Sequence, residues 1–419
     1  MARFFEFIKL CLLICTPAAL AGSAFGQMAD PPVVAPAWDV TGTPLPATPA
    51  PLAPAVPRFW IRTDYLLWWN KSGPLSAPLV TQGSINDSIP GALGQPGTQV
   101  LYGANGIDFR ALSGLRVESG AWLNEDRTLG MESGFFLVGT NAARFSAFSD
   151  ANGNQIIARP VIDAVSATES SYGDSSPGAF SGGATVTNTS ALFSWDINGA
   201  INFVRTDQFR MDGLLGFRYL NLFESLRIED QLSPLVDNSL TFLGQPIDAS
   251  SSLRDMDSFR TINNFYGGQV GTRMTWLLDR WVLTATGKLA LGASQEKVII
   301  RGATALSSSD GSVTYIPGGV LATSANIGDY ERTSFAVVPE VGLNLGFHIT
   351  PRWLVRVGYS FIYWSNVARP GNQVNRLVSP NLVPTDPSYG TAGPNAPAFQ
   401  FQTSSYWAQG INLGFEFDF

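Results

Sequence analysis

The sequence predicts an all-β protein: a transmembrane, antiparallel, up-and-down β-barrel of about 10 strands, with 12 as the alternative, preceded by a cleaved signal peptide and a Pro-rich linker. Three observations predict this fold. Charged residues make up only 14% of the 419 residues, whereas globular proteins carry about 25%. Long segments alternate between apolar and polar residues. The connections between these segments alternate between short and long, as in outer-membrane barrels.

Residues 1–26 have the features of a secretory signal peptide. Arg3 and Lys9 precede an apolar stretch that is too short for a membrane anchor, and Ala19-Leu20-Ala21 or Gly22-Ser23-Ala24 offers a cleavage site. Both cysteines lie in this segment: Cys11 and Cys15. The mature chain is therefore expected to contain no cysteine. Its charge becomes about −8, because the leader removed from a chain of charge −7 carries a net +1.

Residues 27–57 are expected to form a Pro/Ala-rich periplasmic linker. Nine prolines lie between Asp30 and Pro57, and no apolar periodicity runs through them. Such a composition favours an extended chain that cannot build a core. A proline motif that binds a partner protein is the alternative interpretation.

The barrel is expected over residues 58–419, and residues 335–348 show why. Every second residue from Phe335 to Phe347 is apolar, apart from one proline, and the residues between them are small or polar, apart from Val338. This alternation runs for about fourteen residues, whereas strands of soluble proteins usually have 5–6 and a strand that crosses a bilayer needs about 9–11. Pro339 predicts a local bulge or a missing ladder hydrogen bond.

The same alternation occurs in ten segments: 59–70, 106–122, 127–140, 187–205, 208–229, 258–278, 281–301, 329–348, 352–366 and 405–419. Short connections are expected at 123–126, 206–207, 279–280 and 349–351, and long polar loops at 71–105, 141–186, 230–257, 302–328 and 367–404. An even number of strands places both termini on one side, which is the periplasmic side for an exported barrel. Residues 155–165 could add a hairpin and raise the count to 12. No run of 18 apolar residues follows the leader, so no transmembrane helix is expected.

Aromatic residues gather near the ends of the expected strands. One group lies beside the short connections: Trp60, Trp122, Trp276, Trp281 and Trp353. The other lies beside the long loops: Trp68, Trp69, Tyr363, Trp364, Tyr406 and Trp407. Together they predict an aromatic girdle at each membrane interface.

The C-terminus resembles the signal that the outer-membrane insertion machinery recognises in its substrates. Its polar-x-Gly-x-x-aromatic-x-aromatic pattern comprises Asn412, Gly414, Phe417 and the last residue, Phe419. The alternative is an ordinary amphipathic last strand. The partners expected from this pattern are outer-membrane lipid, the insertion machinery and periplasmic chaperones, with no nucleic acid because the net charge is −7 and no Lys/Arg cluster occurs.

Several motifs resemble the planctomycete-type outer-membrane β-barrel porin family, the seventh of its series. They are Tyr65-Leu66-Leu67-Trp68-Trp69, then Pro74-Leu75 and Pro78-Leu79-Val80-Thr81, then the hairpin formed by Gly114 to Trp122 and Arg127 to Phe136. The resemblance extends from Arg58 to Phe419. It implies an outer-membrane location and a barrel, and it brings no catalytic or binding residues.

The alternation also predicts which charged side chains line the lumen. The expected cations are Arg62, Arg110, Arg116, Arg210, Arg218, Arg273, Lys288 and Arg356, and the expected anions are Asp64, Asp108, Glu118, Glu132, Asp196, Asp212, Glu340 and Glu416. The two sets balance, which favours mutual neutralisation over a charge-selective filter. A barrel of about 10 strands is close to the size that side chains fill. An internal salt-bridge network is therefore favoured over a narrow, weakly selective pore.

Neither catalysis nor a cofactor is expected. The only histidine, His348, adjoins the short connection at 349–351, away from the expected extracellular rim, and no nucleophile motif accompanies it. With one histidine and no cysteine in the mature chain, only oxygen ligands for Ca²⁺ remain, at 150–154 or at Asp310-Gly311. These segments have the composition of ordinary turns and lack the bidentate Glu of a calcium loop, so no metal site is expected.

Two functions remain open on the sequence. The first is a porin that allows passive diffusion of small solutes, with periplasmic termini and extracellular loops. The second is a non-conducting structural or surface-interaction barrel with a salt-bridged lumen and exposed loops.

Overall fold

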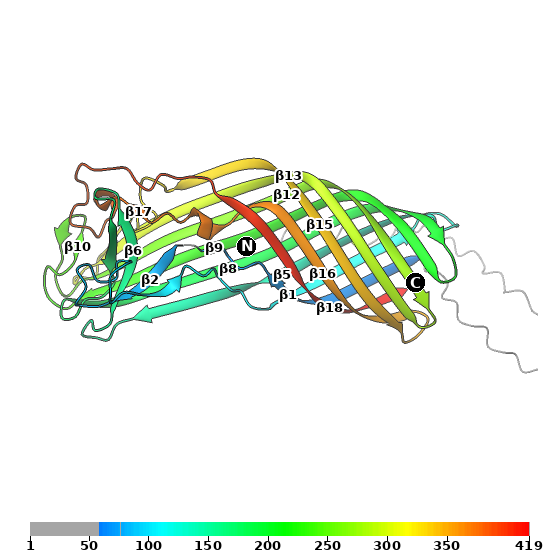
Figure 1. Ribbon diagram of the computed structural model, residues 1–419, viewed down its shortest axis with the longest axis horizontal. Coiled ribbons are helices and arrows are strands. Elements are labelled where there is room, and N and C mark those ends of the chain that lie inside the picture. Colours follow the sequence, from blue (N-terminus) through cyan, green and yellow to red (C-terminus); the bar gives the residue numbers. More distant parts are fainter. Residues whose placement is uncertain (1–57, 76, 419) are drawn as a thin grey trace, which may run out of the picture.

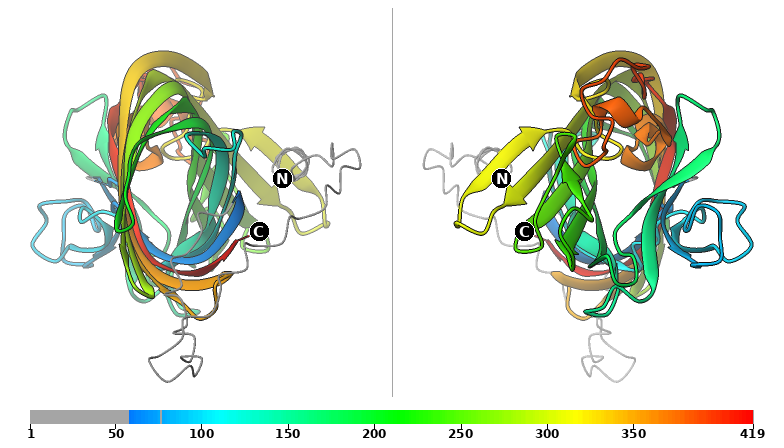
Figure 2. Two further views of the ribbon diagram at one scale, coloured as in Figure 1. Left: turned by 90° about the vertical axis from the view of Figure 1, so that its right-hand side faces the viewer. Right: turned by 90° about the vertical axis from the view of Figure 1, so that its left-hand side faces the viewer.

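The computed structural model describes residues 58–75 and 77–418, and over these residues ten antiparallel strands close into one barrel (Figures 1 and 2). In chain order the wall strands are β1 (Phe59–Asn70), β4 (Leu112–Trp122), β5 (Leu129–Phe148), β8 (Phe180–Arg205), β9 (Phe209–Pro234), β12 (Ser252–Leu278), β13 (Trp281–Ser307), β15 (Gly328–His348), β16 (Trp353–Ala368) and β18 (Thr403–Asp418). Each strand pairs with the next, and β1 pairs with β18 to close the ring. All ten expected strands are confirmed. The expected signal peptide and linker lie outside the described residues.

The two ends of the barrel differ in their connections. At the turn end, the strands are joined by residues 123–128, 206–208, 279–280 and 349–352. β1 begins and β18 ends there, with Trp60 opposite Asp418. At the loop end, five long loops cover residues 71–111 (loop 1), 149–179 (loop 2), 235–251 (loop 3), 308–327 (loop 4) and 369–402 (loop 5). No helix in the described part of the chain is both long and apolar enough to cross a membrane.

Four strands are much longer than a bilayer requires: β8 and β9 have 26 residues each, and β12 and β13 have 27. Near the turn end their outward residues are apolar and exposed, such as Leu215 and Val270, which fits contact with lipid. Toward the loop end the outward residues become polar, such as Arg227 and Glu229, while inward residues such as Ile228 are apolar and buried. The strands therefore continue beyond the lipid-facing band as a loop-end extension with the polarity of a soluble protein.

Toward the loop end, apolar residues face inward and polar residues face outward, and this change explains why β8, β9, β12 and β13 extend beyond the strand ends expected from the sequence. Residues 180–186, 230–234, 252–257 and 302–307 were expected to be loop, because the pattern of apolar residues outside and polar residues inside is lost there. The backbone hydrogen bonds between neighbouring strands continue through this change, because they do not depend on which face of the sheet is apolar.

A second sheet, called the loop sheet here, forms at the loop end from segments of three loops. It has the order β17-β6-β2-β3, with β7 paired to β6. Its strands are β2 (Pro78–Gly83), β3 (Gln99–Gly103), β6 (Ile156–Asp163), β7 (Glu169–Gly173) and β17 (Leu377–Val378). The remaining short elements are β10 (Thr241–Phe242), β11 (Gln245–Pro246), β14 (Val313–Pro317), η1 (Pro370–Gln373) and η2 (Pro380–Leu382). The 12-strand alternative is wrong, because the segment at 155–165 contributes to the loop sheet and not to the wall.

The largest hydrophobic cluster of the described residues connects the wall to the loops. It contains Trp68 and Leu222 of the wall, Val161 of the loop sheet and Leu321 of loop 4, each less than 4% exposed. Burial on this scale holds the loops as folded structure.

The two aromatic groups divide between the inside and the outside of the barrel. Trp69, Tyr363, Trp407, Trp276, Trp281 and Trp353 lie on the outward face, as a girdle requires. The expectation was wrong for the rest: Trp60, Trp122, Trp68, Trp364 and Tyr406 point inward and are at most 6% exposed. The reason is the period of two. It sends the two members of each adjacent aromatic pair to opposite faces, and it places Trp60 and Trp122 in phase with the inward residues Arg62 and Glu118.

Pro339 causes no bulge, because β13 and β15 stay in register through its pairing with Leu289. On the other side of β15, the ladder with β16 ends at Glu340, one residue away. The proline thus occupies a position where no ladder hydrogen bond is needed.

Candidate functional site: a charged lumen

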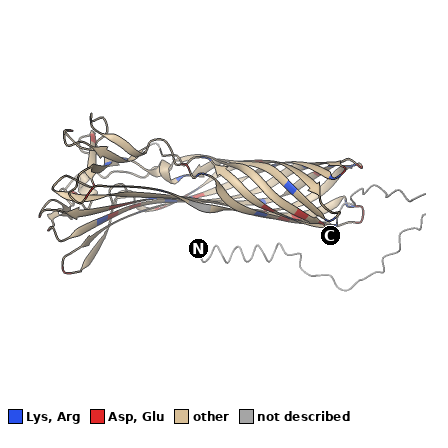
Figure 3. Ribbon diagram, turned by 90° about the horizontal axis from the view of Figure 1, so that it is seen from below, with Lys and Arg blue, Asp and Glu red and all other residues tan. Residues whose placement is uncertain are grey.

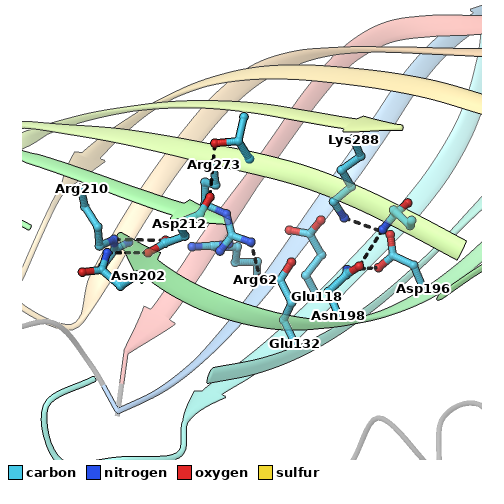
Figure 4. A network of polar contacts seen from close by, with 12 residues as sticks. Arg62, Glu118, Glu132, Asp196, Asn198, Asn202, Arg210, Asp212, Arg273 and Lys288 are labelled. Atoms are coloured by element: carbon cyan, nitrogen blue, oxygen red, sulfur yellow. Dashed lines mark hydrogen bonds and ion pairs between the residues drawn. The ribbon is translucent and has the colours of Figure 1, made fainter. Parts of the chain in front are cut away.

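Most of the charged residues expected in the lumen point into it. The clearest evidence is contact between strands that are not neighbours in the wall: Arg218 of β9 bonds Glu340 of β15, and Arg273 of β12 bonds Glu132 of β5. Such contacts form only when both side chains project inward. Figure 3 marks charged positions along the barrel strands, and in Figure 4 side chains from several strands converge on one another. The structure brings together Arg62, Asp64, Arg116, Glu118, Glu132, Asp196, Arg210, Asp212, Arg218, Arg273, Lys288, Glu340, Arg356 and Glu416.

Asp108 and Arg110 are the exceptions, and the expectation for them was wrong. β4 begins only at Leu112, and both residues lie before it in loop 1, exposed to solvent. The Asp108 carboxylate accepts a hydrogen bond from the Arg110 backbone N–H, and Arg110 has a φ of 58°. This turn interrupts the strand geometry that the alternation assumed.

The centre of the network joins five strands: β4, β8, β9, β13 and β15. Arg218 and Lys288 both donate to Asp196, with N···O distances of 2.8 and 2.9 Å. Arg218 also bonds Glu340, and Arg116 approaches Glu340 at 3.6 Å from the other side. Each carboxylate thus meets two cations, and the chain of contacts crosses the lumen from β4 to β13.

A second group of contacts lies closer to the turn end. Arg356 donates two hydrogen bonds to Asp64, at 2.8 and 2.6 Å, and approaches Glu118 at 3.7 Å and Glu416 at 3.8 Å. Arg62 donates to Glu416 at 2.7 Å. Bidentate arginine–carboxylate pairs hold both planes in a fixed geometry. Arg356 therefore links its own strand, β16, to β1, β4 and β18.

The predicted lumen charges that the structure brings together balance, with seven cations and seven anions once Asp108 and Arg110 are set aside. Buried charges are tolerated when they are paired and hydrogen-bonded, whereas removal of one partner is costly. A neutral network also offers no net field that would attract ions of one sign.

Two small cavities lie within this charged layer. Their volumes are about 50 and 70 Å³, and both are lined by Arg62, Thr284, Asn344 and Arg356. Each has room for a few water molecules.

An aromatic layer follows on the side of the loop end. Trp68 packs against Phe136 with ring centroids 5.2 Å apart, and the Arg116 guanidinium lies over both rings at 5.4 and 5.5 Å. The Trp68 indole N–H donates to Asn412 at 2.8 Å. In addition, Phe265 of β12 meets Trp364 of β16 edge-on, with ring centroids 6.0 Å apart.

The beginning of loop 5 is bound inside the barrel, above the aromatic layer. Asn263 of β12 exchanges two hydrogen bonds with the backbone of Ala368, at 2.9 and 2.7 Å. Arg369 then turns into the lumen and donates to both carboxylate oxygens of Glu224, at 2.8 and 2.6 Å, and to the carbonyl of Ser72 at 2.9 Å. Arg369 and Glu224 are 0% and 1% exposed.

The sequence analysis missed this last pair. A signal for Glu224 was present, since it falls in phase with the inward residues Arg210, Asp212 and Arg218 of β9. No sequence signal marks Arg369, because it enters the lumen from a loop and not from a strand.

A model of the family described as Putative beta barrel porin-7 (BBP7) matches residues 60–419. The chain belongs to this family. The resemblance noted in the sequence is thereby confirmed, and the BBP7 protein is an outer-membrane β-barrel.

Solved barrels resemble the BBP7 chain at low identity. The outer membrane protease OmpT from Escherichia coli is 8% identical with a TM-score of 0.40, covering 86% of this chain and 96% of that one. The toluene transporter TodX of P. putida is 8% identical with a TM-score of 0.22, covering 89% and 93%. An anion-selective porin from Comamonas acidovorans is 6% identical with a TM-score of 0.18, covering 86% and 98%. No curated protein matches the sequence significantly.

His348 lies at the turn end of β15 and lines the 70 Å³ cavity, facing inward. Asp150 of loop 2 accepts hydrogen bonds from the backbone N–H groups of Asn152 and Asn154, which is ordinary turn geometry. Within residues 58–75 and 77–418, no group of three His, Cys, Asp or Glu side chains is placed to hold a metal ion.

The loop-end extension of the BBP7 barrel holds a second charged cluster, called the acidic cluster here. Arg159 of β6 donates to Asp230 at 2.6 Å and to Asp257 at 3.0 Å, and Asp174 and Asp255 lie nearby. All five side chains belong to residues that are at most 3% exposed. Asp257 also accepts hydrogen bonds from the backbone of loop 4, at Leu321 and Ala322. The cluster therefore ties the loop sheet and loop 4 to β9 and β12.

The acidic cluster carries four carboxyl groups against one guanidinium. Burial raises the pKa of Asp230 to about 6, despite the opposing effect of Arg159. Burial, together with the charge of Asp230, raises the pKa of Asp174 well above its ordinary value. Burial and the charge of Asp257 likewise raise the pKa of Asp255. These groups retain protons at a pH where exposed carboxyls have lost them.

The residues of the expected insertion signal have structural contacts of their own. Asn412 points inward, accepts from Trp68 and donates to Ser360 at 2.7 Å. Phe417 points outward and packs against Trp353, with ring centroids 4.8 Å apart. Phe419 lies outside the described residues, and recognition by the insertion machinery stays a prediction.

Gly414 allows Asp64 to approach Arg356, and its replacement by alanine is expected to disturb that pair. A Cβ at Gly414 would lie 2.1 Å from Oδ1 of Asp64 and 2.2 Å from the carbonyl oxygen of Thr63. We expect Gly414→Ala to lower the free energy of unfolding by about 1–3 kcal/mol, as overpacking does. Urea unfolding of the refolded barrel in lipid measures this loss. Gly268→Ala is the matched control, since a Cβ there meets nothing within 4 Å. Equal stability of the two variants would contradict the expectation.

Proposed function

We propose that this protein is a non-conducting outer-membrane barrel that presents a folded loop-end structure at the cell surface. The observation that carries the proposal is that three layers lie in series along the lumen: the charged network, the aromatic layer of Trp68 and Phe136, and the loop 5 segment held by Arg369 and Glu224. The two cavities in the charged layer hold only a few waters. Salt bridges across a ten-stranded wall also leave little freedom for side chains to move aside.

In the proposed orientation, the turn end faces the periplasm and the loops face outward. Supporting this, both described ends of the chain lie at the turn end, where an exported linker would connect. The loop-end extension adds support, because its polar outer surface needs water and its length exceeds the bilayer. We further propose that the insertion machinery and periplasmic chaperones deliver the barrel, with residues 412–419 as the signal.

Conductance of the refolded barrel in a planar bilayer tests the proposal. We expect no stepwise conductance at saturating insertion, because the charged network, the aromatic layer and the loop 5 segment lie in series along the lumen. Co-flotation with liposomes and a heat-dependent shift in gel mobility verify that the protein is folded and inserted. Reproducible unitary steps from such preparations would overturn the closed-barrel proposal.

Passive diffusion of small solutes is the second candidate, favoured by the description of the family and by the polar cavities near the turn end. It requires the loop 5 segment and the aromatic layer to move together. In liposome swelling with arabinose, this candidate requires uptake that the closed barrel would not support.

A further inference from the structure

We propose that a pocket at the loop end binds a neutral polyhydroxylated ligand, a saccharide in its chemical class. The pocket lies between residues 372–375 of loop 5 and residues 398–404, which form the end of loop 5 and the beginning of β18, with Asn326 of loop 4 on a third side. Its volume is about 480 Å³, within the range of small-molecule sites. The orange-to-red segments in Figure 2 show loop 5 at the mouth of the loop end.

The lining chemistry selects the class of ligand. The lining residues include six side-chain amides and two hydroxyls and no charged group: Asn326, Asn372, Gln373, Asn375, Gln400, Gln402, Thr403 and Ser404. An amide presents a donor and an acceptor side by side, which matches hydroxyl groups that both donate and accept. A charged ligand would find no counter-ion among these residues. An apolar ligand would leave the amides without partners.

Part of the lining is held in place by the protein itself. The Gln373 amide donates to the carbonyl of Arg369 at 3.1 Å and to that of Gln402 at 2.7 Å. These bonds connect the beginning of loop 5 to its end. Asn326 is fixed by donation to the carbonyl of Leu321 at 2.9 Å and by the backbone N–H of Thr323 at 2.9 Å. These bonds reduce the entropy that a ligand would otherwise have to overcome on binding.

Other polar groups of the pocket are free to meet a ligand. Over the described part of the chain, the hydroxyl oxygen of Ser404 is buried without a hydrogen-bond partner. A buried polar group in that state is costly, and a bound hydroxyl would satisfy it. The side chains of Gln400 and Gln402 belong to exposed residues at the rim, where they can reach a ligand.

An aromatic side chain completes the wall. Phe399 lines the pocket and is stacked on Tyr330, with ring centroids 3.6 Å apart, and Phe401 meets it edge-on at 5.7 Å. A rigid aromatic ring beside several amides offers an apolar surface to the C–H face of a sugar ring while the amides bind its hydroxyls.

The inference rests on the proposed function only in placing this pocket at the cell surface, since it names a ligand class for the presented loops. Binding in detergent or nanodiscs does not depend on orientation or conductance. A conducting barrel that binds saccharides would overturn the proposed function alone, and a closed barrel that binds none would overturn this inference alone.

The experiment measures binding of maltose and cellobiose to the full chain in nanodiscs by saturation-transfer difference NMR and calorimetry. We expect at least one of the two to bind with a dissociation constant on the order of 1 mM or tighter. Di-galacturonic acid, a charged disaccharide of similar size, is expected to bind at least about tenfold more weakly, because the residues that line the pocket include no cation to pair with its carboxylates.

Variants locate the site. Gln400→Ala with Gln402→Ala is expected to weaken binding about tenfold, since two amides are removed without a change in the fold. Gln208→Ala at the turn end is the matched control and leaves binding unchanged. Ala398→Trp, which fills the pocket from an exposed position, abolishes binding. No binding of either sugar, equal binding of the charged disaccharide, or equal binding by the Gln400/Gln402 variant would each overturn the inference.

Discussion

Replacing Arg369 by methionine is expected to lower the free energy of unfolding by about 3–5 kcal/mol and to loosen loop 5 at the mouth of the barrel. The guanidinium provides two hydrogen bonds to Glu224 and one at 2.9 Å to the carbonyl of Ser72. Methionine keeps most of the volume but leaves the carboxylate of Glu224, which is 1% exposed, buried without its partner.

Urea unfolding in lipid measures the loss of stability, and cleavage of loop 5 by a protease measures the loosening. The double variant Arg369→Met with Glu224→Met should recover most of the stability, because no unpaired charge remains. Arg227→Met is the matched control: its pair with Glu229 is 52% and 43% exposed and is expected to contribute less than about 1 kcal/mol. The interpretation fails if the double variant is as unstable as the single one.

The loop-end extension is expected to be more stable at pH 5 than at pH 8, because of the acidic cluster. Burial raises the pKa of Asp230 to about 6 in the folded protein, above the ordinary 3.8 of the unfolded chain. A carboxyl whose folded pKa is raised contributes stability that is fully present below the unfolded pKa and is lost as the pH rises through the folded pKa. For Asp230 alone, the loss between pH 5 and pH 8 is about 1.4 kcal/mol, and the raised pKa values of Asp174 and Asp255 add to it.

Hydrogen exchange of the amides in the loop sheet, corrected for intrinsic rates, measures the local opening free energy at the two pH values. Asp174→Asn removes one of the excess acids while it keeps the shape of the side chain, and one carboxylate oxygen of Asp174 has no partner over the described residues. We expect this variant to be stabilised at pH 8 and to show a smaller pH dependence. Asp207→Asn, exposed at the turn end, is the control. A loop sheet that is more stable at pH 8 than at pH 5 would show that the sign is wrong.

The sequence alone predicted the wall of the barrel, because apolar and polar residues alternate along each wall strand according to the face on which they lie. Segment 329–348 matches β15 within one residue, since lipid on one face and a polar lumen on the other select alternating residues. The same period placed Arg218, Asp196 and Glu340 inside, although not which of them would meet.

The prediction failed where the surroundings change along one strand. In β9, Asp212 and Ile228 both point inward, yet the first lies behind the lipid-facing band and the second in a soluble-type core. The prediction assumed that apolar residues face outward along the whole strand, and it therefore placed the end of β9 too early. It also assigned Trp68 and Trp364 to the girdle, because a tryptophan suits an interface and an aromatic core equally well.

What the sequence by itself determined is the barrel: its strand number, its short and long connections, and the phase of its inward charges, all of which follow from local alternation. Only the tertiary structure decided which side chains meet inside the lumen. The pairing of Arg218 with Glu340 joins strands on different sides of the ring, and Arg369 reaches Glu224 across 145 positions of the chain. Local patterns carry no information about such contacts, because they depend on the closure of the ring and on the path of loop 5 back into it.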